Sequence, residues 1–130
     1  MKIISLLIIV SAILGTILVS SRIGAFIDVA SVLAVIIPVI ASIPAKHGLE
    51  GFKELFREGE NQSKILHTMG VTAILTGAIV TTIGMVIMLG NLQEQSAVGP
   101  ALALALLTLF YGLLIFLFTT LLSTKNFGEK

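Results

Sequence analysis

Two rows of small and hydroxyl-bearing residues are the parts of this sequence with the most potential for chemistry. Plotted at 100° per residue, the first row covers about 80° of a helix and comprises Gly70, Ala73, Gly77, Thr81 and Gly84. The second is a similarly narrow stripe of Ala101, Ala105, Thr108, Gly112 and Thr119. In lipid, small residues let helix backbones approach, and threonine hydroxyls can bond across to a neighbour. The rows predict one of two arrangements: packing between helices of this chain, or a helix surface that faces neither lipid nor another part of this chain. Periodicity alone does not distinguish these two arrangements.

The stretches that carry these rows contain no Asp, Glu, Lys or Arg. Every Asp, Glu, Lys and Arg lies between or beyond four apolar runs, at residues 3–19, 29–45, 65–89 and 101–123. Membrane-embedded ionisable groups relay protons in pumps and transporters, so we expect no proton transfer by this chain alone and disfavour a proton-coupled drug exporter. We also expect no enzyme, because no protected nucleophile–base set, carboxylate pair or phosphate loop is present. His47 and His67 could titrate near neutral pH, but neither is assigned a role.

The elements that must position these residues are membrane helices. The 130-residue chain is 56% hydrophobic and 12% charged, whereas soluble domains have about 25% charged residues. Because a crossing helix needs about 20 apolar residues, the runs predict an all-α membrane protein, one domain over residues 1–130 with four transmembrane helices. Seven of the eight Lys and Arg residues fall on the side of the two termini, and only Arg22 falls on the other. This asymmetry places both termini in the cytoplasm, and we expect the first run to be a retained helix rather than a cleaved signal peptide.

Within residues 46–64 a short amphipathic cytoplasmic helix is expected between the second and third spans, and Gly59 and Asn61 are expected to break it before the third span begins. The apolar face of this short helix would consist of Leu49, Phe52, Leu55 and Phe56, which recur at helical spacing. Such a helix could rest at the headgroup boundary or contact a cytoplasmic partner, and the first interpretation is favoured.

Two stretches resemble the MotA family of flagellar stator proteins, which is more distantly related to TolQ and ExbB. They are SSRIGAFIDVASVLAVI, residues 20–36, and GAIVTTIGMVIMLGNLQEQSAVGPALALALLTLFYGLL, residues 77–114. Their most specific parts are MLGN, AVGPA and ALLTxxYG. The resemblance implies a homopentamer in the bacterial inner membrane around a dimer of single-span partners, of the MotB, ExbD or TolR kind, whose membrane aspartate binds the ion. It further implies an ion-conducting subunit of a rotary motor, with a non-conducting membrane scaffold as the alternative.

The same resemblance assigns an ion path to residues of the third and fourth spans. Thr81 matches the third-helix position that faces the partner's aspartate in sodium-type relatives, and Thr108 matches the first residue of a Thr-Thr pair in those relatives. Leu109 stands where the second threonine would help to define a sodium site. With Gly77 and Ala105, these residues are expected to line the pore. The loss of one hydroxyl at Leu109 favours H⁺ over Na⁺ as the transported ion, and no cofactor is expected.

Outside the ion path, the resemblance assigns residues to an ion entrance and to a helix-opening turn, and it reveals one difference from the MotA family. Asp28 matches an outer-side aspartate near the ion entrance of sodium-type relatives. Gly99 and Pro100 match the turn that opens the fourth helix. MotA proteins carry a large cytoplasmic domain between their second and third helices, where this chain has only residues 46–64. The resemblance therefore implies a compact motor subunit rather than an ordinary flagellar one.

Overall fold

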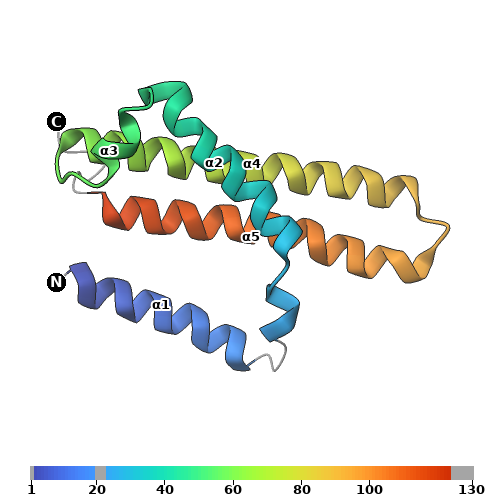
Figure 1. Cartoon of the computed structure of the whole chain (residues 1–130). Helices are drawn as coiled ribbons and strands as arrows, with labels where there is room; N and C mark the ends of the chain where they lie inside the picture. The colour runs from blue at the N-terminus through green and yellow to red at the C-terminus, as the bar shows by residue number, and fades with distance from the viewer. Residues whose placement is uncertain (1, 20–22, 124–130) are drawn as a thin grey trace.

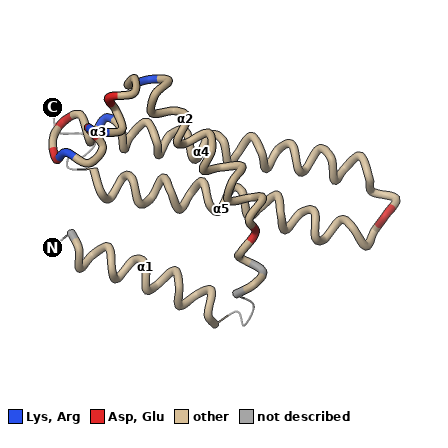
Figure 2. Tube along the Cα trace, viewed as in Figure 1, with Lys and Arg blue, Asp and Glu red and all other residues tan. Residues whose placement is uncertain are grey.

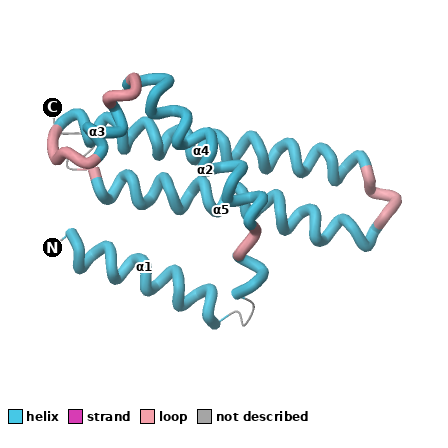
Figure 3. Tube along the Cα trace, in the orientation of Figure 1, coloured by secondary structure: helices cyan, strands magenta, loops and turns pink. Residues whose placement is uncertain are grey.

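The computed structural model describes residues 2–19 and 23–123, and in this part of the chain helices are joined by short loops, without strands (Figures 1 and 3). The elements are α1 (Lys2–Val19), the 3-10 helix η1 (Ile23–Phe26), α2 (Val29–His47), α3 (Gly51–Leu55), α4 (Glu60–Gly90) and α5 (Gln95–Leu122). The all-α prediction is confirmed for these residues. Arg22 and the C-terminal lysines, which entered the prediction of orientation, lie outside the described residues.

The longest elements, α4 and α5, form an antiparallel hairpin joined by a short turn at residues 91–94 (Figure 1). At a rise of 1.5 Å per residue, the 31 residues of α4 and the 28 of α5 extend about 46 and 42 Å. Both lengths exceed the roughly 30 Å hydrocarbon core of a bilayer. The hairpin is therefore long enough to cross a membrane and to project beyond it.

Helix α2 crosses one face of this hairpin, beginning beside the middle of α5 and ending beside the first turns of α4 (Figure 1). Its buried Val35 and Val39 meet Ala73 of α4 in a small apolar core. Met69 of α4 and Tyr111 of α5 pack against this core. The crossing thus places the beginning of α2 against the middle of α5.

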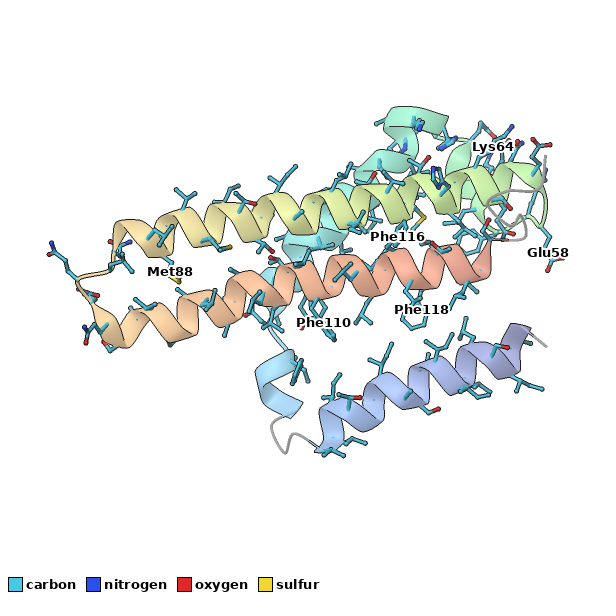
Figure 4. All side chains as sticks on the ribbon, turned by 180° about the vertical axis from the view of Figure 1, so that it is seen from behind. Glu58, Lys64, Met88, Phe110, Phe116 and Phe118 are labelled. Atoms are coloured by element: carbon cyan, nitrogen blue, oxygen red, sulfur yellow. The ribbon has the colours of Figure 1, made fainter. Side chains whose placement is uncertain are left out.

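Helix α1 lies apart from this three-helix unit, on the side of α5 towards which Phe110 and Phe118 extend (Figure 4). Most of its large side chains are exposed, among them Ile4, Leu7 and Leu14. By length and composition, α2, α4 and α5 can each cross a membrane, whereas the apolar part of α1, Ile3–Val19, is shorter than such a span. Three of the four predicted spans are thus supported, and a transmembrane α1 stays a prediction.

The segment between α2 and α4 contains less helix than the sequence suggested. Instead of one amphipathic helix that begins at residue 46, α2 continues to His47 and α3 covers only Gly51–Leu55. The predicted break at Gly59 is confirmed, since α4 begins directly after it at Glu60. The reason lies in two glycines with positive φ, Gly48 at 68° and Gly59 at 158°, which interrupt the helical backbone where other residues would be strained. Figure 2 shows that most of the charged residues gather at this end of the molecule.

The fourth predicted helix also begins earlier than expected. Gly99 and Pro100 do not form a turn before it, because α5 starts at Gln95 and includes both. Proline has no amide proton, so Pro100 leaves the carbonyl of Ser96 without its helical hydrogen bond. Ser96 is exposed and close to the beginning of the helix, where water can donate a hydrogen bond to that carbonyl. Gly99 lacks the Cβ that usually clashes with a following proline. The prediction that Gly99 and Pro100 form a turn before this helix was therefore wrong, because the helix begins at Gln95.

Candidate functional site

Two threonines form a buried hydroxyl cluster between α4 and α5. The Thr81 hydroxyl donates to the Ala105 carbonyl at 2.7 Å, and the Thr108 hydroxyl donates to the same oxygen at 2.7 Å. The two hydroxyl oxygens lie 2.9 Å apart. Since two hydroxyls carry only two protons, these three contacts cannot all be hydrogen bonds at once. The cluster therefore retains lone pairs that could accept a bond from water or contact a cation.

The small residues of the two rows face one another across the same interface. A Cβ added to Gly112 would lie 2.5 Å from the Ala73 carbonyl oxygen, and one added to Gly77 would lie 2.9 Å from the Thr108 carbonyl oxygen. A Cβ on Gly84 would lie 2.9 Å from the Ala105 Cβ. Helix–helix packing, the first of the two interpretations of the rows, is confirmed for these glycines. An additional role in an ion path stays a prediction for Gly77.

A groove of about 360 Å³ opens beside this interface, bounded by the start of α2, the second half of α4 and the first half of α5. Its polar lining comes from Asp28, Ser31 and Thr108, and Ala105 is among its apolar lining residues. The structure therefore brings the predicted entrance residue Asp28 to the same groove as Thr108 and Ala105. The other predicted pore residues, Thr81, Gly77 and Leu109, do not line this groove. Leu109 is partly buried, and its Cα would lie 3.4 Å from a Cβ added to Gly77.

Asp28 caps α2, and among the described residues it carries the only carboxylate that lines the groove. Its Oδ2 accepts from the Ser31 hydroxyl at 2.5 Å and from the Ser31 amide at 2.8 Å. These bonds, the hydroxyl first, lower the pKa of Asp28 from its ordinary value because they favour the charged carboxylate. A negative charge therefore stands at one end of the groove at neutral pH. The spacing of Asp28 and Ser31 is the signature of a helix cap, a signal that could have identified Ser31 from the sequence.

Tyr111 ties this end of the groove to α5. Its hydroxyl donates to the Phe26 carbonyl and accepts from the Asp28 amide at 3.3 Å. The Phe26 ring also meets the Phe110 ring edge-on, with centroids 5.7 Å apart. Sequence reasoning gave Tyr111 no role, although it is the only tyrosine of the chain and lies in an apolar helix, where its hydroxyl would need a partner.

Fold and site together define a class: a multi-pass helical membrane protein with a largely apolar groove, bordered by one carboxylate, beside a tightly packed helical hairpin. Residues 49–127 match the family model described as the MotA/TolQ/ExbB proton channel family. The chain belongs to this family.

Individual relatives match over shorter stretches. Motility protein A of Cereibacter sphaeroides is 51% identical over 39 residues, which are 30% of this chain and 15% of that protein. The chemotaxis protein PomA of Vibrio alginolyticus is 41% identical over 51 residues, 39% of this chain and 20% of that protein. The matches thus cover a fifth or less of these curated relatives. No solved structure matches the chain.

Proposed function

We propose that the chain is an ion-conducting subunit of a compact MotA-like rotary motor in the inner membrane of a bacterium. Five copies would surround a dimer of single-span partners of the MotB, ExbD or TolR kind. Each partner would supply the membrane aspartate that this chain lacks. The gradient of H⁺, or alternatively of Na⁺, would then drive mechanical work without a cofactor and without chemical conversion of a substrate.

The observation that carries this proposal is the groove that holds Asp28 and Thr108, in a member of a family of proton channels. The carboxylate at one end would concentrate cations, and the hydroxyl further along would offer oxygen to a passing ion or water. The apolar runs contain no Asp, Glu, Lys or Arg. This supports a partner as the source of the ion-binding carboxylate, since a proton path needs a group that titrates.

Capture of the partner tests the proposal directly. The full chain is co-expressed with candidate single-span proteins that carry one aspartate in the span, and the purified complexes are weighed by native mass spectrometry. We expect a complex of five copies with two partners, and ion flux in proteoliposomes that disappears when the partner's aspartate becomes asparagine. A chain that stays monomeric and captures no such partner would contradict the proposal.

The transported ion is proposed to be H⁺. Leu109 supplies no oxygen where sodium-type relatives have a second threonine, and a desolvated Na⁺ needs several oxygen ligands. A proton needs only the partner's carboxylate and a path of water. Flux that follows the pH gradient at constant Na⁺ would support H⁺, and flux that requires Na⁺ would overturn this assignment.

A non-conducting membrane scaffold is the second candidate, favoured by the small residues that pack α4 against α5 inside one chain. Thr108→Val and Thr108→Ser distinguish the two functions, because valine keeps the shape of the side chain and serine keeps the hydroxyl. In a motor, valine should allow assembly but reduce ion flux, and serine should retain the flux. In a scaffold, both variants should differ from the wild type only in stability or assembly.

A further inference from the structure

A second, smaller pocket lies at the charged end of the molecule, away from the groove. It opens between the last turn of α2 and the first turns of α4 and has a volume of about 250 Å³. Its polar lining comes from Lys46 and Ser42 of α2 and from His67, Thr68 and Thr72 of α4. None of the described residues that line it carries a carboxylate. The Ser42 and Thr68 hydroxyls donate to the carbonyls of Val39 and Lys64, so the donors that face an oxyanion are the Lys46 ammonium, the His67 imidazole and the Thr72 hydroxyl.

Within residues 2–19 and 23–123, no neighbour neutralises the charge of Lys46. At this end of the molecule, Lys53 pairs with Glu50 at 3.6 Å and Lys64 pairs with Glu60 at 3.2 Å, both on exposed side chains. Among the described residues, Lys46 takes part in no ion pair. The pocket is therefore bordered by a cation whose counter-ion is not supplied by the described part of the chain.

A hydrogen bond beside the pocket holds its two walls together. The Thr68 hydroxyl donates to the Lys64 carbonyl at 3.0 Å and lies 2.9 Å from Nε2 of His47. A hydroxyl has one proton, so Thr68 either donates to Lys64 and accepts from Nε2 of His47, or donates to that nitrogen, according to the tautomer of His47. This bond fixes the last residue of α2 to α4, so the pocket is already shaped before anything enters it.

We propose that this pocket binds the phosphate group of an anionic phospholipid. It lies where the apolar run of α2 ends in Lys46 and His47, and basic residues that end a span sit at headgroup level. Basic pockets between membrane helices at that level are suited to lipid headgroups. Ala45 and Val71 complete the lining with apolar surface, which suits the glycerol and first acyl carbons. The volume is below the roughly 300–1,000 Å³ typical of sites for drug-sized ligands, so a phosphate-sized group fits better. This inference does not depend on the proposed motor function.

Native mass spectrometry of the full chain tests the proposal. The wild type, Lys46→Gln and His67→Gln are reconstituted in nanodiscs of equal phosphatidylglycerol and phosphatidylcholine, extracted into detergent, and compared for the lipid they retain. Lys53→Gln is the matched control, because it removes the same charge from the same end but does not line the pocket. Lys46 is exposed, so Lys46→Gln should fold, which circular dichroism checks.

We expect the wild type and Lys53→Gln to retain phosphatidylglycerol over phosphatidylcholine. Lys46→Gln should reduce this preference about fivefold, the effect of one cation near an anionic membrane surface, and His67→Gln should reduce it as well. Equal retention of the two lipids by the wild type, or equal losses in Lys46→Gln and Lys53→Gln, would overturn the proposal. In a parallel arm, inorganic phosphate is added to the micelles. Displacement of the lipid by phosphate at equal concentration would identify a free anion, rather than a lipid, as the ligand.

Discussion

Replacing Gly112 with alanine should push α4 and α5 apart and destabilise the protein. The added Cβ would lie 2.5 Å from the Ala73 carbonyl oxygen, whereas carbon–oxygen contacts between packed helices are normally about 3.3–3.6 Å long. The backbones must therefore separate by roughly 0.9 Å, because a carbonyl in a helix cannot rotate away as a side chain can. Overpacking of this kind costs about 1–3 kcal/mol. Against it stands the gain of about 1 kcal/mol from helix propensity when glycine becomes alanine.

The net loss in the free energy of unfolding should therefore be about 2 kcal/mol, taking the upper end of the overpacking range for a backbone clash. Unfolding in mixed micelles, by titration with sodium dodecyl sulfate and circular dichroism, measures it. Gly15→Ala is the matched control, since nothing lies within 4 Å of its added Cβ, and it should be neutral or stabilising by up to about 1 kcal/mol. Gly77→Ala should fall between the two, because its added Cβ would lie 2.9 Å from a backbone oxygen.

The order of stability of these three variants is the clearest test of the prediction. If Gly112→Ala is as stable as Gly15→Ala, the backbones of α4 and α5 do not approach as closely as the structure has them. The packing interpretation of the two rows would then be wrong, and the small residues would be available to face another molecule.

Three further predictions concern the polar groups near the groove. Thr81→Val should lower the free energy of unfolding by about 0.6 kcal/mol, the average for a hydrogen bond between membrane helices. Thr81→Ser should keep the bond to the Ala105 carbonyl, and unfolding in mixed micelles compares the stability of the two variants. Ser31→Ala should raise the pKa of Asp28 towards its ordinary value, as measured by carboxyl NMR. With Ser31 present, the stability gained from the Asp28 carboxylate holds above the unfolded-state pKa of about 3.9 and is lost only as pH falls through the lowered native pKa. Tyr111→Phe removes an acceptor of the Asp28 amide, so exchange of that amide should accelerate up to about tenfold, and unchanged exchange would contradict the contact.

Local sequence was sufficient to predict the helices but not all of their ends. Three spans were found because long apolar runs without charges have few alternatives to a membrane helix. The boundary at Gln95 was missed because Gly99 and Pro100 usually signal a turn, and only their place near an exposed helix end makes them tolerable in α5. The helix predicted between the second and third spans was too long because Gly48 adopts a positive φ, which the apolar spacing does not reveal. The break at Gly59 was predicted, because glycine commonly ends a helix.

The candidate site depended on contacts that no local pattern contains. Asp28 and Tyr111 are 83 residues apart, and their contact exists only because α2 crosses the hairpin beside the middle of α5. Likewise, a stripe of small residues reveals one face of a helix but not which neighbour covers it. The structure supplies that neighbour for both rows, since each row covers the other.

Because the two rows of small residues pack against each other, few of their residues remain available to line an ion path. Gly77 and Gly112 are closed against backbone atoms of the opposite helix, so they cannot also present a smooth wall to a partner helix unless the hairpin opens. Ala105 and Thr108 border both the interface and the groove, so they can pack and face an ion at the same time. We therefore expect any ion path on this face to run from Asp28 towards Thr108. At equal stability, substitution of Thr108 should reduce ion flux more than substitution of Gly77; the reverse order would place the path inside the hairpin.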